Sequence, residues 1–291
     1  MSATDIAGST IAPEPTRSRR LAFLRRPVIL ASGTVVAAFI VVAALAPAIA
    51  PYSPSATDFT AVLAPPSGRH LLGTDDLGRD VLSRLIYGAR ASQEAGVLAT
   101  AIALAVAVPV GLVAGFFRGR LDATIARLID VMLAFPSLVL AVALSAIFGP
   151  SLTNATLALG IAAIPGLVRV ARGETLVLRE QTFVKAAIVS ATPTHTILRR
   201  HVLPNLASTL IVQATVTIPT AIIGESMLSF LGLGVQAPTP SWGSMLSAAE
   251  PYIASAPRLI LLPIAAIFAV TLSYNLLGDA LRDALDPRLR L

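Results

Sequence analysis

Six long apolar stretches without a charged residue constrain this chain more than any other feature of its sequence. The first, Val28–Ala50, is about 23 residues long, which lets a helix cross a hydrocarbon core of roughly 30 Å. It exceeds the roughly 7–15 apolar residues of a signal peptide, so we interpret it as a retained span, although Ala48-Ile49-Ala50 resembles a cleavage site. The other five are Ala95–Phe117, Val131–Gly149, Leu152–Val168, Leu206–Gly224 and Leu259–Gly278. The sequence therefore predicts an all-α integral membrane protein with about six transmembrane helices.

The composition supports a lipid environment. Hydrophobic residues make up 55% of the 291 residues and charged residues only 13%. The chain has no cysteine, which excludes disulfides, thiolate metal sites and a cysteine nucleophile. A net charge of +6 would suggest nucleic acid in a soluble protein, but arginines that flank spans and face anionic lipid explain it better. We therefore expect the lipid bilayer, and not nucleic acid, as a partner.

The distribution of basic residues predicts the orientation of the chain. If the N-terminus is cytoplasmic, 17 of the 22 lysines and arginines lie inside. The five outside are Arg69, Arg79, Arg84, Arg90 and Arg258. Because basic residues favour cytoplasmic loops, we predict a multi-pass protein of the cell membrane, plasma or inner, with both termini in the cytoplasm.

These spans divide the chain into five predicted parts. A cytoplasmic tail rich in proline, serine, threonine and arginine is expected to be disordered. It is followed by the first span, an outer loop, a transmembrane core with a polar cytoplasmic loop at 170–205, and a short cytoplasmic tail. Their boundaries are 1–27, 28–50, 51–92, 93–285 and 286–291.

The end of the outer loop is predicted to form an amphipathic helix. Thr74 can cap it, and Asp75 and Asp76 are favourable in a first turn. Five apolar side chains then share one face, typical of a helix on the membrane surface: Leu77, Val81, Leu82, Leu85 and Ile86. A calcium loop is the alternative, but its alternating carboxylates and closing glutamate are absent from this spacing, so no metal site is predicted.

The most polar stretch inside the core is VKAAIVSATPTHTILRRHVLPN, Val184–Asn205, which holds the only lysine and two of the three histidines. Thr192-Pro193 is a typical helix start, which predicts a short helix from Pro193 to about Arg200. Two arginines at its end suit the helix dipole, and Pro204 is expected to end the segment. We predict a surface that another protein binds; a loop whose charges only set the topology is the alternative.

A second outer segment is ESMLSFLGLGVQAPTPSWGSML, Glu225–Leu246. Its glycines and prolines predict a break after the preceding helix, at Gly232, Gly234, Pro238 and Pro240. Trp242, the only tryptophan, is placed where an interfacial aromatic residue is expected. The segment is either a connector between two spans or an outer mouth that contacts a delivering partner.

These segments resemble the inner-membrane permeases of ATP-binding-cassette importers, in the "C" subunit of the oligopeptide, dipeptide and nickel branch. The resemblance runs from about Pro27 to Pro287. It is carried by LGTDDLGRDVLSRLIYGAR (Leu72–Arg90), RLIDVMLAFPSLVLA (Arg127–Ala141), RHVLPN (Arg200–Asn205) and the second outer segment. It implies a six-helix fold of the type I importer kind, a second homologous permease, two ATPase subunits bound from the cytoplasm and an external substrate-binding protein.

The resemblance also assigns residues. Lys185-Ala186-Ala187 occupies the place of the family's Glu-Ala-Ala, and Ala191 the place of its glycine, so the charge of the first position is inverted. An ATPase-coupling role is implied for Lys185, Ala186, Ala187, Ala191, Thr192, Pro193, Thr194, Ile197, Leu198, Arg199, Arg200, His201 and Pro204. An outer mouth is implied at Glu225, Gly232, Gly234 and Trp242.

Other functions fit the sequence less well. The chain lacks a G-x-x-x-x-G-K-[ST] phosphate loop, so we predict a transport subunit without a cofactor or catalytic residue, with ATP and magnesium on the partner ATPases. An ion-coupled transporter would place ionisable residues near mid-membrane, and these spans hold few. An intramembrane enzyme is not favoured because His70 falls outside, and His195 and His201 inside. Peptide is the substrate expected from the resemblance; nickel and glutathione are the alternatives.

Overall fold

The computed structural model describes residues 27–285, and helices make up almost all of the regular structure in this range. Four of its helical stretches are long and apolar enough to cross a membrane, or five if one bent pair counts as a span. The apolar helix α2 (Pro27–Ala44) is shorter and continues into the single turn α3 (Ala46–Ile49). With α2 included, the predicted all-α fold of about six spans is confirmed. The predicted tails, 1–27 and 286–291, lie outside the described residues except for Pro27, which begins α2.

The helix α4 (Val81–Phe117) is one continuous helix of 37 residues. The prediction of a separate amphipathic helix before a span at Ala95 was therefore wrong. Asp80, and not Thr74, is the N-cap, because its carboxylate accepts a hydrogen bond from the backbone N–H of Ser83 at 2.8 Å. Four of the five apolar residues expected on the membrane surface, Val81, Leu82, Leu85 and Ile86, instead belong to the first turns of this long helix, and Leu77 precedes it.

The predicted straight span Val131–Gly149 is also wrong. The structure has two helices here, α5 (Gly119–Leu133) and α6 (Ser137–Phe148), which meet at an angle of 84°. Pro136 at the start of α6 supplies no N–H and breaks the helix. Asp122 and Asp130 on α5 pair with Arg172 and Arg169 of α7 (Leu152–Arg179), each at 2.8 Å, which aligns α5 along that helix.

The helix α7 (Leu152–Arg179) continues well past the predicted end at Val168. The short helices α8 (Thr182–Val189) and α9 (Thr194–Ile197) follow. A π-helical turn, Leu198–Val202, then joins α9 to α10 (Leu203–Phe230) without a break. Pro204 therefore does not end the segment as predicted, because it occupies the first turn of α10, where a missing N–H costs no hydrogen bond.

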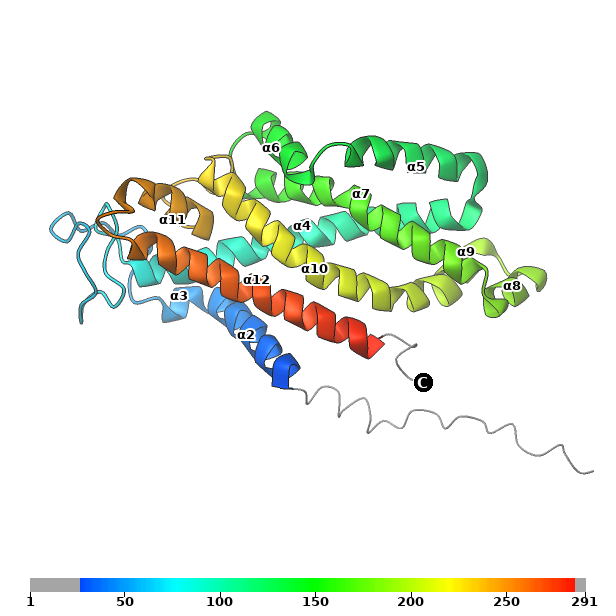
Figure 1. Cartoon of the computed structure of the whole chain (residues 1–291), viewed down its shortest axis with the longest axis horizontal. Helices are drawn as coiled ribbons and strands as arrows, with labels where there is room; N and C mark the ends of the chain where they lie inside the picture. Colours follow the sequence, from blue (N-terminus) through cyan, green and yellow to red (C-terminus); the bar gives the residue numbers. More distant parts are fainter. Residues whose placement is uncertain (1–26, 286–291) are drawn as a thin grey trace, which may run out of the picture.

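The chain ends with α11 (Trp242–Ala249), a short turn at Glu250–Tyr252 and α12 (Arg258–Leu285). The helix break predicted near Gly232 is confirmed, since α10 ends at Phe230. The helices α4 and α7 form the centre of the bundle, with α2 and α12 on one side and α5 and α6 on the other (Figure 1).

The two ends of the bundle hold different segments. The loop before α4 and α11 lie together at one end, and α8 and α9 lie at the other (Figure 1). The start of α2, the end of α12 and the α4–α5 junction also lie toward the α8–α9 end (Figure 1). We call these the outer end and the inner end, after the orientation that the sequence predicts.

Candidate functional site

The turn at the inner end is made by Ala191. Its φ is +52°, and the N–H groups of Ala191 and Thr192 donate to the carbonyls of Ile188 and Ala187 at 3.0 and 3.1 Å. This is the Schellman arrangement, which normally places glycine at the left-handed position. Thr192-Pro193 does not form the turn, and Pro193 rather than Thr192 is the N-cap of α9.

Lys185 is engaged within the chain. Its Nζ lies 2.9 Å from Oε2 of Glu180, whose other oxygen is 2.6 Å from Nη2 of Arg118. The hydrogen bonds of Lys185, and then of Arg118, hold the pKa of Glu180 below its ordinary 4.5. The inverted charge at the first Glu-Ala-Ala position thus ties α8 to Glu180 and, through it, to the α4–α5 junction.

The apolar residues of α9 face inward, contrary to what the sequence predicted for a docking helix. Ile197 is only 2% exposed and belongs to a core cluster with Leu112, Phe116 and Val184. Leu198 packs against the same cluster. The surface that remains open at this end is instead formed by side chains of α8 and of the following turns: Phe183, Ile188, Val189, His195, Arg199 and Arg200.

Trp242 is buried at the outer end, so the prediction of an interfacial, partner-facing aromatic was wrong. Its side chain is 0% exposed, and its indole N–H donates to the carbonyl of Leu85 at 3.1 Å. Phe39 of α2 meets the indole ring edge to face, with 5.8 Å between ring centroids. A Cβ on Gly88 would lie 2.9 Å from the indole, so this glycine lets α4 and α11 approach closely.

Glu225 is also buried, at 0% exposure. Ser92 of α4 donates to one carboxyl oxygen at 2.8 Å, and Ser229 donates to the other at 2.6 Å. Ser229 in turn accepts from the N–H of Val235 at 2.9 Å, which fixes the loop after α10. Gly234 is packed against Ser229, so Gly232 is the only exposed member of the four predicted mouth residues.

Arginine side chains hold the loop before α4 in place, a role that the sequence did not reveal. Nη2 of Arg258, at the start of α12, donates to the carbonyls of Leu63 and Ala64 at 3.0 and 2.9 Å. Asp75, Asp76 and Asp80, in the stretch considered as a calcium loop, all have partners within the chain. Asp75 pairs with Arg79 and Arg84 at 2.7 and 3.3 Å. Asp76 pairs with Arg79 at 3.2 Å, and Asp80 pairs with the buried His70 at 2.9 Å.

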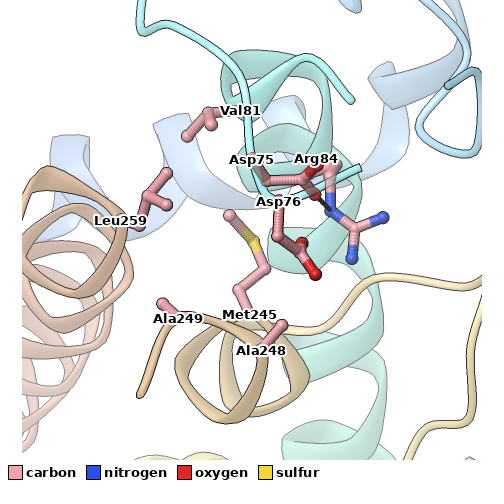
Figure 2. Close-up of a pocket in the computed structure, with 8 residues that line it drawn as sticks. All are labelled: Asp75, Asp76, Val81, Arg84, Met245, Ala248, Ala249 and Leu259. Atoms are coloured by element: carbon pink, nitrogen blue, oxygen red, sulfur yellow. Dashed lines mark ion pairs between the residues drawn. The ribbon is translucent and has the colours of Figure 1, made fainter. Parts of the chain in front are cut away.

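Asp75, Asp76 and Arg84 line a small hollow between α4, α11 and α12 (Figure 2). Its volume is about 20 Å³, with room for roughly one water molecule. In Figure 2, Met245 points into the hollow from α11 opposite these charged groups. We interpret the hollow as part of the packing of the outer end.

A much larger groove, of about 420 Å³, opens between α6, α7 and α10. Its floor contains small residues of α7, Ala162, Ala163 and Gly166, and its polar residues are Ser137, Gln213, Thr217 and Thr220. We call it the α10 groove. The groove was not predicted from the sequence. The uncharged amide of Gln213, which follows three apolar residues within a predicted span, was a signal that could have indicated it.

The chain matches a known family over most of its length. Residues 107–291 match the family described as the inner membrane component of binding-protein-dependent transport systems. The chain belongs to this family of permeases. Residues 15–66 also match the N-terminal transmembrane domain of oligopeptide transport permease C. The predicted resemblance to the "C" type of peptide permease is thereby confirmed.

Several relatives of this permease carry names that state a substrate. It is 43% identical over 256 residues to a dipeptide transport system permease of Alkalihalophilus pseudofirmus, covering 88% of this chain and 84% of the relative. It is 46% identical over 254 residues to a di/tripeptide permease of Pseudomonas aeruginosa, covering 85% and 84%. A glutathione permease of Pectobacterium atrosepticum is 41% identical over 269 residues, covering 92% and 89%.

Solved structures support the fold of the permease. It superposes on an inward-facing structure of the MetNI methionine ABC transporter with a TM-score of 0.59 and 17% identity. The match covers 69% of this chain and 96% of that one. This match confirms the predicted type I importer permease fold. The family match and the named relatives confirm the predictions of a multi-pass membrane protein and of a permease subunit that is not itself the ATPase.

Proposed function

We propose that this permease forms half of the pathway of an ATP-driven importer for short peptides, which an external binding protein delivers. The observation that carries the proposal is the similarity over most of the chain to dipeptide and di/tripeptide permeases. Glutathione is the second candidate substrate, because a glutathione permease is similar over 92% of this chain. Glutathione is itself a tripeptide, so both candidates carry uncharged amide groups.

We assign an orientation and a set of partners to the two ends of the bundle. Basic residues gather toward the inner end, which supports a cytoplasmic location for that end and for both termini. Two ATPase subunits, which would hold ATP and magnesium, dock there, and the binding protein docks at the outer end. A second, homologous permease completes the pathway.

The exposed side of α8 is the best candidate for the ATPase contact. Val189 is 87% exposed, and Phe183 and Ile188 of the same helix are exposed as well. An apolar patch beside Arg199 and Arg200 suits neither water nor lipid, but it suits the groove of a protein partner. We therefore place the contact on these side chains and not on Ile197, which the chain buries in its own core.

The test is Val189→Asp in proteoliposomes that contain the assembled importer, with ion gradients collapsed and ATP present. A carboxylate buried in the docking groove costs several kcal/mol, so we expect uptake of a labelled dipeptide to fall more than about tenfold. Val189→Leu is the matched control and should keep normal uptake. Because Val189 is exposed, neither change should alter membrane insertion of the chain. Normal dipeptide uptake by Val189→Asp would refute the docking surface, and absence of ATP-driven dipeptide uptake in the wild type would refute the proposed substrate.

A further inference from the structure

We propose that the α10 groove binds the solute during transport and that it recognises uncharged amide groups through Gln213, Thr217 and Thr220. The inference rests on the proposed function, because it locates within this chain a contact that the peptide makes on its way. It also names the chemistry of that contact, which the similarity to other permeases does not supply.

The groove has the shape of a binding surface and not of a helix–helix contact. Its volume of about 420 Å³ falls within the range of roughly 300–1,000 Å³ that is usual for small-molecule sites. Three small residues of α7, Ala162, Ala163 and Gly166, form its floor. Because side chains this small leave the space between α7 and α10 unfilled, the hollow is built into the packing of the two helices.

The polar groups of the groove can pair with an amide. The hydroxyls of Thr217 and Thr220 donate to the carbonyls of Gln213 and Val216 at 2.8 and 2.9 Å, one turn earlier in α10. Their hydrogens are thus engaged, and their free lone pairs can accept from a peptide N–H. The Gln213 side chain makes no hydrogen bond within residues 27–285, so its amide can both donate and accept.

A comparison with α12 separates the groove from the lipid-facing surface. In the outer half of α12, up to Leu272, the exposed large side chains form a stripe that is entirely apolar: Leu261, Ile264, Phe268 and Leu272. The next exposed polar side chain, Asn275, lies further toward the inner end. Gln213, Thr217 and Thr220 lie on α10 at the same helical spacing, but they present an amide and two hydroxyls. An unpaired amide in contact with lipid tails would cost several kcal/mol, so this side of α10 is not expected to face lipid, and water or a polar solute suits its amide and hydroxyls.

Cysteine accessibility tests whether the groove is wet. In the assembled importer, Thr217→Cys and Thr220→Cys are compared with Phe268→Cys and Leu272→Cys on the apolar stripe. Each variant is treated with a charged methanethiosulfonate reagent, and the label on this chain is measured. The chain has no cysteine of its own, so all label on it comes from the introduced residue. The groove cysteines should react about tenfold faster or more, because thiolates form in water and not in lipid. Equal, slow rates at all four positions would show a groove covered by lipid or by dry protein contact and would overturn the proposal.

Photolabelling tests whether the peptide touches the groove. A dipeptide that carries a diazirine should label the fragment of α10 that contains Gln213, and Gln213→Leu should weaken the labelling about fivefold to tenfold by removing one hydrogen-bonding amide. Gln213→Asn should restore part of the labelling, and Ile211→Leu, on α10 but outside the groove, should leave it unchanged. Binding of the dipeptide to the isolated binding protein serves as the reference. Two results would overturn this inference while ATP-driven uptake stays normal: labelling outside the α10 fragment, or labelling of that fragment that Gln213→Leu does not weaken. Either result would leave the proposed function intact.

Discussion

The outer and inner ends of this permease differ in how far their key side chains are buried. At the outer end, Trp242 and Glu225 are fully buried, and their polar atoms are paired with Leu85 and Ser92 of α4 and with Ser229 of α10. At the inner end, Val184 packs α8 into the core, but the ion pairs of α8 are exposed, and the apolar side chain of Val189 is left open to solvent. The difference indicates that the outer end holds a fixed shape by itself, whereas the inner end is completed by a partner.

The same turn at the two ends shows this contrast in detail. Both α10 and α8 end in a Schellman motif, with Gly232 at φ +75° at the outer end and Ala191 at φ +52° at the inner end. Glycine occupies the left-handed region without strain, whereas the Cβ of alanine raises the free energy of this conformation by roughly 1 kcal/mol. The outer turn is therefore relaxed, and the inner turn holds strain beside the proposed ATPase contact.

The largest effect is expected from Trp242→Ala. Removing this side chain leaves a cavity between α2, α4 and α11 and should lower the free energy of unfolding by about 3–5 kcal/mol. Phe268→Ala is the matched control, because Phe268 is 64% exposed and should cost far less. Thermal unfolding of the purified permease in detergent measures both. Equal losses for the two variants would show that the outer end is not the rigid part of the molecule.

A smaller effect of opposite sign is expected from Ala191→Gly. Relief of the left-handed strain should raise the free energy of unfolding by up to about 1 kcal/mol, reduced by the greater freedom of glycine in the unfolded chain. Ala186→Gly, in the middle of α8, should instead lower it by about 0.5–1 kcal/mol. Chemical unfolding curves of both variants decide the sign. A loss of stability in Ala191→Gly would remove the distinction between the relaxed and the strained turn.

The smallest effect concerns the exposed bridge Arg118–Glu180–Lys185. Because these contacts lower the pKa of Glu180 from its ordinary 4.5, their contribution to stability is complete above pH 4.5 and is lost as the pH falls through the lowered pKa. The difference in melting temperature between the wild type and Glu180→Gln should therefore be constant from pH 7 to about pH 5 and should shrink below that. Exposed ion pairs contribute little, and a difference that persists at pH 3 would show that Glu180 acts through packing and not through charge.

Much of the fold was predictable because a membrane imposes simple rules on a sequence. The apolar lengths located the spans, and the glycines after Phe230 located the end of α10. The bend between α5 and α6 was not predicted, because apolar length does not distinguish a straight span from a broken one. The π turn that joins α9 to α10 was missed for a related reason, since Pro204 is as compatible with the first turn of a helix as with its end.

The sequence by itself determined that this chain spans a membrane, roughly where its apolar spans lie and which segments are too polar for lipid. Only the tertiary structure decided which way the side chains face: Ile197 and Trp242 inward, Val189 outward, and Gln213 into a groove. The physical reason is that lipid tails and the interior of a helical bundle are about equally apolar. Hydropathy therefore places a residue in the membrane but cannot tell a buried position from a lipid-facing one, and only the packing of the helices makes that distinction.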